Sequence, residues 1–129
     1  MAAKKLPRPT DAELAILRVL WSQGPSTVRQ VHEVLSREKD TGYTTVLKFM
    51  QIMADKGLVT RNETSRTHVY AAACSEDKTQ RQLVGDLLDR AFGGSARKLV
   101  MQALSAKKAS PDEIAEIRRL LDEMEQTRV

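Results

Sequence analysis

Residues 42–57 constrain this chain most, because two glycines bracket one helix-length stretch. Val46, Phe49, Met50 and Met53 recur within it at helical spacing and form an apolar stripe. A surface helix of any globular protein can show such a stripe, so the neighbouring segments must decide its role. The other face is polar and hydrogen-bonding around one central cation, and it consists of Thr44, Thr45, Lys48, Gln51 and Asp55.

Two helices are predicted before this stretch. Thr10 can cap the first, with Asp11 and Glu13 at the positive end of the helix dipole, and Gly24-Pro25 ends it. Ser26 is predicted to cap the second. Because a glycine-containing turn joins the second helix to the third, the pattern is that of a helix-turn-helix. The apolar faces are Leu14, Ile16, Leu17, Leu20 and Trp21 in the first helix, and Val28, Val31, Val34 and Leu35 in the second.

A strand pair is predicted after the third helix. Gly57 can end that helix in the left-handed conformation, residues 58–63 and 67–71 alternate as strands, and residues 64–66 form the turn. Three helices followed by a hairpin is the order of a winged helix domain, whose third helix can enter the major groove. Arg66 lies at the hairpin tip and is predicted to contact DNA, the alternative being a solvated arginine.

Length and composition limit what surrounds this domain. The chain of 129 residues has room for one domain, or for one small domain and an oligomerisation segment. Aromatic residues make up only 4%, so association between chains would help to bury apolar surface. The net charge of +4 suits a polyanion only weakly, but all of it belongs to residues 1–73, with 11 Lys+Arg against 7 Asp+Glu. Residues 74–129 hold 10 of each.

The cellular location is predicted from absences in the sequence. The single cysteine, Cys74, excludes an intrachain disulfide and suits a reducing compartment. No apolar run approaches the length of a signal sequence or a membrane span. We therefore expect a soluble, cytoplasmic protein without membrane insertion. Residues 4–9 are expected to form an extended basic arm, because their prolines oppose a helix.

Several short runs resemble the penicillinase repressor (BlaI/MecI/CopY) family of winged helix repressors. They are Tyr43-Thr44-Thr45-Val46, residues 56–61, Ser65-Arg66 and Tyr70, together with residues 9–14 and Leu20-Trp21 in the first helix. The resemblance covers most of residues 6–125. It implies a homodimer that binds a near-palindromic operator and represses transcription. It also implies that Thr44 and Thr45 face bases or phosphates, with Lys48 one turn further on.

Physical reasoning supports the same three positions. Threonine hydroxyls can donate to phosphates or base edges, threonine methyls can pack on thymine, and amides at a helix start favour phosphate. Two features depart from the family. Lys48 and Ile52 stand where a small or polar residue and an arginine are common, so the operator sequence cannot be transferred. Ser65 stands where a glycine is usual in the hairpin turn.

The second half of the chain predicts three more helices. The first spans residues 76–92, Ser95 caps the second, and Ser110-Pro111 with Glu113 begins the third. Their apolar stripes have no further partner in so short a chain, so we expect them to pack against a second copy. The alternative is a monomer in which they fold back on the winged domain. The predicted dimerisation residues are Leu83, Leu87, Leu88, Leu99, Ile114, Ile117, Leu121 and Met124.

Chemical activity is not expected. His32, His68 and Cys74 have no partners at catalytic or metal-ligand spacing, so we predict no catalytic residue, metal or cofactor. The cysteine pairs by which the CopY branch of the family senses copper are absent. In the family, a membrane sensor that responds to a β-lactam antibiotic leads to cleavage of the repressor at an Asn-Phe pair. The aligned position is near Gln102-Ala103, so that pair is not retained, and either the protease has a different preference or the signal is not a β-lactam.

The sequence therefore predicts a mainly α fold with a small β-hairpin wing. Residues 1–74 form a winged helix-turn-helix DNA-binding domain, and residues 75–129 form a helical dimerisation domain. The function predicted is a homodimeric transcriptional repressor on double-stranded operator DNA, relieved by proteolysis linked to a membrane sensor. The DNA-binding residues are Thr44, Thr45, Lys48, Gln51 and Arg66. Two alternatives stay open, a ligand-responsive winged helix regulator of another family and a helical protein-interaction module without DNA binding.

Overall fold

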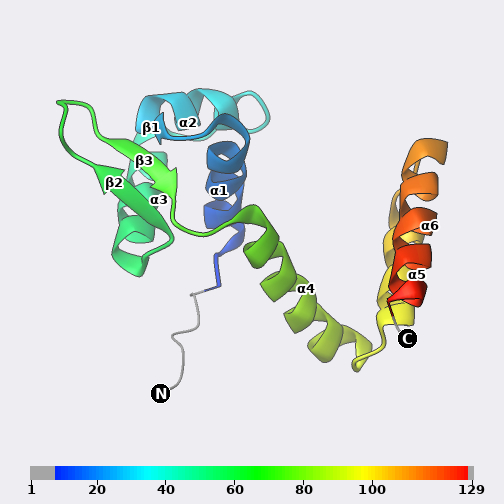
Figure 1. Cartoon of the computed structure of the whole chain (residues 1–129). Helices are drawn as coiled ribbons and strands as arrows, with labels where there is room; N and C mark the ends of the chain where they lie inside the picture. Colours follow the sequence, from blue (N-terminus) through cyan, green and yellow to red (C-terminus); the bar gives the residue numbers. More distant parts are fainter. Residues whose placement is uncertain (1–7, 128–129) are drawn as a thin grey trace, which may run out of the picture. The chain divides into compact units, whose positions relative to one another are not determined.

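The computed structural model describes residues 8–127, and its chain divides into two units. The amino-terminal unit is Met1–Val84 and the carboxyl-terminal unit is Gly85–Val129. Helices dominate and one small antiparallel sheet accompanies them, which confirms the predicted fold class (Figure 1). Most of the predicted basic arm, residues 4–9, lies outside the described residues.

Three complete helices lie in the described part of the amino-terminal unit: α1 (Asp11–Gln23), α2 (Val28–Ser36) and α3 (Tyr43–Lys56). The predicted cap of α1 is confirmed, because the Thr10 hydroxyl accepts from the Glu13 amide at 3.2 Å and the Glu13 carboxylate accepts from the Thr10 amide at 2.9 Å. Gly57 ends α3 in the left-handed conformation at a φ of 84°.

The predicted cap of α2 was wrong by one residue. Thr27, not Ser26, caps the helix, because the Thr27 hydroxyl accepts from the Gln30 amide and the Gln30 side chain accepts from the Thr27 amide at 2.8 Å. If Ser26 were the cap, the residue three positions later would be Arg29. An arginine side chain has no acceptor atom, so it could not accept a hydrogen bond from the Ser26 amide. Ser26 is buried instead, and its hydroxyl donates to the Gly24 carbonyl at 2.8 Å.

The sheet has three strands in the order β1-β3-β2, with both neighbouring pairs antiparallel. The predicted hairpin is present as β2 (Val59–Asn62) and β3 (Val69–Ala72), both shorter than the alternation indicated. The sequence did not predict β1 (Ser26–Thr27), because two residues cannot show an alternating pattern. Figure 1 shows the hairpin projecting from the three helices, so its tip is an open loop.

The core of the amino-terminal unit lies between the three helices and the sheet. Val46, Met50 and Met53 of the predicted α3 stripe are buried, and Phe49 packs against them at the edge. The indole of Trp21 donates to the Cys74 carbonyl at 2.9 Å, which ties α1 to the segment after β3. The other buried apolar residues include Ile16, Leu17, Leu20, Val31, Leu58, Val59 and Tyr70.

An ion pair joins the beginning of α1 to the end of α3. The Lys56 ammonium lies 3.1 and 3.0 Å from the two carboxylate oxygens of Glu13, whose side chain is only 2% exposed. Burial raises the pKa of Glu13, while the bonds from the Thr10 amide and from Lys56 lower it. The net pKa lies below the ordinary 4.5, so the carboxylate is charged at neutral pH.

This pKa predicts how stability depends on pH. A carboxyl group with a lower pKa in the folded state stabilises that state above its unfolded pKa and loses the contribution as pH falls through the folded pKa. We therefore expect the free energy of unfolding to fall more steeply below pH 4.5 in the natural protein than in Glu13→Gln. Urea unfolding followed at a series of pH values tests this, and parallel pH profiles would contradict it.

The carboxyl-terminal half contains α4 (Glu76–Phe92), α5 (Ala96–Ala106) and α6 (Pro111–Gln126), as predicted. Ser95 accepts from the Lys98 amide at 3.2 Å, and Ser110 accepts from the Glu113 amide at 3.1 Å. Both serines therefore cap the helices they were predicted to cap. The division of the chain falls inside α4, after Val84, and the buried Thr79 belongs to the amino-terminal unit. The predicted boundary after residue 74 stays a prediction.

The apolar stripes of these helices are poorly covered within one chain. In the described part of the chain, α5 and α6 contain no buried residue, and Leu121 and Met124 are each 57% exposed. Leu87 is also exposed. The other predicted dimerisation residues, Leu83, Leu88, Leu99, Ile114 and Ile117, are half-buried.

Candidate nucleic-acid interface

The outward face of α3 follows from its buried stripe. A step of about 100° per residue puts Thr44, Lys48 and Asp55 close together, opposite Val46, Met50 and Met53. All three outward residues are exposed. Gln51 flanks them on one side, and Thr45 and the half-buried Ile52 flank them on the other. The result is a strip of short polar side chains with a single lysine at its centre.

The amino end of α3 has no side-chain cap. Gly42 is the N-cap residue and makes no side-chain hydrogen bond, whereas side chains cap α1, α2, α5 and α6. The Val46 amide is the first in α3 to bond a carbonyl of the turn, that of Gly42 at 3.2 Å. The amides before it point out of the first turn, where the helix dipole favours an anion. This end of α3 therefore suits a phosphate group.

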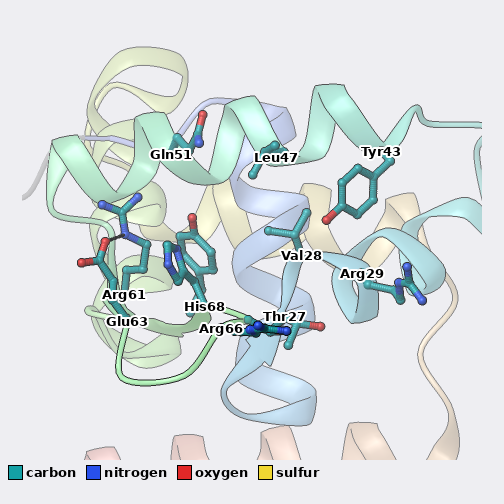
Figure 2. A pocket seen from close by; sticks show the side chains of 12 residues that line it. Thr27, Val28, Arg29, Tyr43, Leu47, Gln51, Arg61, Glu63, Arg66 and His68 are labelled. Atoms are coloured by element: carbon teal, nitrogen blue, oxygen red, sulfur yellow. Dashed lines mark ion pairs between the residues drawn. The ribbon is translucent and has the colours of Figure 1, made fainter.

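A groove runs between α3, the start of α2 and the hairpin (Figure 2). It has a volume of about 660 Å³ and is open to solvent. Tyr43, Leu47 and Gln51 form the α3 wall, and Figure 2 shows Arg29 at the Tyr43 end and Arg61 at the Gln51 end. The remaining lining residues are Thr27, Val28, Glu63, Arg66, Thr67, His68 and Tyr70.

The charge of the groove is mainly positive. Arg29, Arg61 and Arg66 contribute three cations against the carboxylate of Glu63. The Arg61 Nε lies 2.7 Å from the Glu63 Oε1. A hydrogen bond to Tyr70 and then the charge of Glu63 raise the pKa of Arg61. Because this ion pair is solvent-exposed, it contributes little to stability, but it orients the guanidinium along the groove.

The five predicted DNA-binding residues do not share one pocket. Gln51 and Arg66 line the groove, whereas Thr45 lines a second hollow beside α1 and the turn before α3. Thr44 and Lys48 lie on the exposed face of α3 between them. The four residues of α3 thus lie along one strip, and Arg66 lies apart from them at the hairpin tip. An extended polymer can contact such separate positions at the same time, whereas a small molecule in one pocket cannot. Their contacts with DNA stay a prediction.

Hydrogen bonds of its own side chains hold the tip of the hairpin. The side-chain Oδ1 of Asn62 accepts from the backbone amide and the hydroxyl of Thr64, at 3.0 and 2.7 Å. The Ser65 hydroxyl donates to the Thr67 carbonyl at 2.6 Å. Because no non-glycine residue among residues 8–127 has a positive φ, this turn does not need a glycine. Ser65 is therefore tolerated where the family usually has glycine.

Arg29 and Arg61 were missed as candidate site residues. The signal for Arg61 was available, because it is two residues after the buried Val59 and alternation puts both on one face of β2. That face is turned to α3, so Arg61 was predictable as a groove residue. Arg29 was not, because it lies beside the groove only through the pairing of Ser26 and Thr27 with β3.

The histidines have ordinary surroundings. His32 Nε2 hydrogen bonds to the Thr41 carbonyl at 2.7 Å, and its ring meets that of Tyr43 edge-on at 5.7 Å. His32 thus fixes the turn before α3. His68 lies at the groove, and Cys74 is buried. Among the residues described, no three His, Cys, Asp or Glu side chains are grouped to hold a metal ion.

The sequence matches the penicillinase repressor family over residues 9–123. The chain belongs to this family. It is 38% identical to the transcriptional regulator BlaI of Mycobacterium tuberculosis, over 94% of this chain and 88% of that protein. The predicted resemblance is confirmed, and the family membership favours the repressor over the two alternative functions.

Two solved structures are similar to part of this penicillinase repressor family member. The DNA-binding domain of the repressor BlaI is 26% identical with a TM-score of 0.51, over 57% of this chain and 90% of that one. Bacillus licheniformis BlaI, in a monomeric form in complex with the blaP half-operator, is 25% identical with a TM-score of 0.50. It covers 58% of this chain and 92% of its own.

These findings confirm the predicted class of function, a DNA-binding transcriptional repressor. The protein is a DNA-binding transcriptional repressor with a winged helix domain, and it is not an enzyme. In the part of the chain that the structure describes, no helix is long and apolar enough to cross a membrane. The cytoplasmic location stays a prediction.

Proposed function

We propose that this repressor binds a near-palindromic operator as a homodimer and blocks transcription by occupying it. The observation that carries the proposal is the exposed polar strip of α3 beside a groove with three arginines, all in one small unit. The excess positive charge of the chain lies in residues 1–73, which suits a polyanionic partner.

In this proposal α3 lies in the major groove with its first turn foremost. The uncapped amides and the hydroxyls of Thr44 and Thr45 bind a phosphate or base edges. Lys48 reaches a phosphate or a guanine, and Gln51 can pair with an adenine through two hydrogen bonds. Ile52 lies beside them and offers only an apolar contact, so it is the position at which this operator differs from those of relatives with an arginine there.

The hairpin and the start of α2 position the domain on the backbone. Arg66 at the tip and Arg29 and Arg61 in the groove are proposed to contact phosphates, which fix register without reading sequence. Glu63 partly neutralises Arg61 in the free protein. A phosphate that replaces Glu63 would therefore gain less from Arg61 than from Arg66, whose guanidinium is exposed.

The uncovered stripes of α4, α5 and α6 support the homodimer. Burial of an exposed Leu or Met side chain contributes about 1.5–3 kcal/mol, and two-fold symmetry doubles each contribution. Leu87, Leu121 and Met124 are exposed by about half or more in the single chain, so a second copy is the natural cover. The B. licheniformis relative binds a half-operator in its monomeric form, which fits an operator with two halves.

Relief by proteolysis linked to a membrane sensor is the proposed route to derepression. Gln102 and Ala103, which align with the cleavage site of the family, are exposed on α5. A protease needs an extended backbone, so local unfolding of α5 would precede cleavage. Cleavage there would separate α6 from the rest of the chain and remove part of the proposed dimer interface.

The proposed function is tested by titrating the full chain into duplexes from the DNA that flanks its gene, at several salt concentrations. We expect tight binding to a fragment with a two-fold repeat, with an affinity that falls steeply as salt rises. Binding that is absent from every duplex would contradict the proposal. Binding without salt dependence would contradict the role assigned to the cations.

A further prediction concerns the uncapped start of α3. Gly42→Asp would supply a capping carboxylate, and the backbone at φ −69° and ψ 143° accepts any residue. We expect the free energy of unfolding to be unchanged or to rise by a few tenths of a kcal/mol. Operator affinity should fall about tenfold, because the carboxylate competes with phosphate for the amides. Isothermal titration calorimetry measures the change in operator affinity, and thermal unfolding measures the change in stability.

Gly42→Asn is the matched control, because its amide caps the helix without a charge. It should lose less affinity than Gly42→Asp and show the same salt dependence as the natural protein. If both variants bind the operator as tightly as the natural protein, then the amides at the start of α3 do not contact DNA.

A further inference from the structure

The Glu13–Lys56 ion pair lies where both proposed DNA-contacting elements of the amino-terminal unit are attached. Lys56 is the last residue of α3, Gly57 follows as its left-handed C-cap, and β2 begins at Val59. Glu13 lies in the first turn of α1, which α3 packs against. A contact at this point therefore acts on the recognition helix and on the hairpin together.

Stability alone does not account for the pair. Glu13 is 2% exposed and Lys56 is 37% exposed, so the carboxylate has lost nearly all of its water. Such desolvation offsets most of the attraction within a buried ion pair, and apolar replacements of similar size are often neutral or stabilising. What the pair does supply is direction, because both oxygens of Glu13 bond one ammonium at 3.0 and 3.1 Å. The two bonds therefore favour placements of the α3 end that keep Lys56 beside Glu13.

The pair also withholds Lys56 from DNA. Lys56 lies about 80° around the helix from Lys48, on the side of α3 that packs against α1. Its ammonium is committed to Glu13, whose other hydrogen bond, from the Thr10 amide at 2.9 Å, fixes the carboxylate in turn. Lys56 therefore acts on DNA recognition through its position, not through a phosphate contact.

We propose that Glu13 and Lys56 are positioning residues for operator recognition, holding the end of α3 and the start of the hairpin at the angle that base contacts require. The proposal rests on the proposed function, because it assumes that α3 and the hairpin contact DNA. A recognition helix that pivots on its packed stripe would keep its phosphate contacts and lose base contacts. Specific affinity should then fall while non-specific affinity stays.

The test compares Glu13→Gln, Lys56→Met and the double variant in the full chain. The glutamine keeps an oxygen for the Thr10 amide, and the methionine keeps most of the lysine stem. We measure affinity for the operator and for an unrelated duplex, the salt dependence of both, and thermal unfolding. Lys107→Met, beyond the end of α5, controls for the loss of one positive charge.

Lys56→Met leaves the buried Glu13 carboxylate without its cation, so it is expected to unfold more easily, whereas Glu13→Gln leaves only the part-exposed Lys56 unpaired and should cost less stability. The double variant leaves none unpaired and should regain much of that stability. We expect it to bind the operator about tenfold more weakly than the natural protein, which corresponds to the loss of one base contact. Its affinity for the unrelated duplex and its salt dependence should match those of the natural protein, because the double variant loses one charge of each sign.

The double variant decides the matter even if the single variants do not fold. A stable double variant that binds the operator as tightly as the natural protein would overturn the proposal and leave the pair a structural contact. Equal losses for operator and unrelated duplex would also overturn it, because Lys56 would then be a phosphate contact. Failure of the natural protein to bind any duplex would instead contradict the proposed function.

Discussion

The Leu121→Glu/Met124→Glu protein is expected to be a monomer that binds a two-half operator two to four orders of magnitude more weakly than the natural protein. Both side chains are 57% exposed in the single chain and lie on the apolar stripe of α6. Two carboxylates per chain would have to be desolvated in a two-fold interface, where they also repel their copies. Losing the second DNA-binding unit removes the gain from linkage, about 10² to 10⁴ in affinity.

Sedimentation equilibrium measures the change in mass, and titration of duplexes with one and with two half-sites measures the change in binding. The variant should bind the single half-site as the natural protein does, because its amino-terminal unit is unaltered. Residues 1–84 alone should behave in the same way. Ala115→Glu/Gln126→Glu is the matched control, since it adds the same charge to the opposite face of α6 and should stay dimeric.

A dimeric Leu121→Glu/Met124→Glu protein would contradict the interface assigned to α6. A monomer with undiminished affinity for the two-half operator would contradict the need for a dimer. In that second case the apolar stripes would have another partner, and the alternative in which the carboxyl-terminal helices cover the winged domain would regain support.

The second large effect is expected from Lys48→Ala/Arg66→Ala. A phosphate contact from a charged side chain contributes about 1.5–3 kcal/mol, or roughly one to two orders of magnitude in affinity. The two residues lie on separate elements, so their losses should add. If both contact phosphates, a dimer loses four contacts, and the salt slope should fall by about one unit for each.

Filter binding across a range of salt concentrations measures this slope. Lys98→Ala/Lys107→Ala removes the same charge from α5 and the residue after it, so it serves as the control with a nearly unchanged slope. An unchanged slope in Lys48→Ala/Arg66→Ala would refute the assignment of both side chains to the backbone. A lower affinity for one operator sequence with an unchanged slope would instead make Lys48 a base contact.

Helix boundaries were predictable because capping is a local property. Thr10 with Glu13, and Ser110 with Pro111, are short signals that need no knowledge of the rest of the chain, and the structure has both caps. The one capping error, at Ser26, arose because Thr27 beside it is an equally good residue. The reciprocal bond from Gln30 decided between them.

Contacts between distant segments were not predictable. Glu13 at the third position of α1 would ordinarily be exposed, and nothing near it in sequence indicates a partner at residue 56. The strand β1 and the placement of Arg29 beside the hairpin depend likewise on tertiary pairing. Alternation along β2 would have predicted that Arg61 lies on the face turned to α3. It would not have predicted that Tyr70 and Glu63 accept hydrogen bonds from its guanidinium.

The polar strip of α3 was predictable because periodicity alone separates Thr44, Lys48 and Asp55 from the buried stripe. The role of this strip is a different matter, since exposure is shared by every surface helix. The missing side-chain cap at Gly42 and the adjoining arginine groove are what make this helix unlike the others in the chain. Asp55 places a carboxylate within the strip. A carboxylate repels a phosphate and accepts a hydrogen bond from cytosine, so the base that faces Asp55 affects operator affinity.

Selection of duplexes from a random pool by the full chain tests the central claim most directly. We expect the recovered sequences to share two inverted half-sites, with centres one helical turn of about 10 base pairs, or a multiple of it, apart. The Leu121→Glu/Met124→Glu protein should recover single half-sites. Recovery of no common sequence, or of one unpaired site by the natural protein, would contradict a homodimeric repressor that reads a near-palindromic operator.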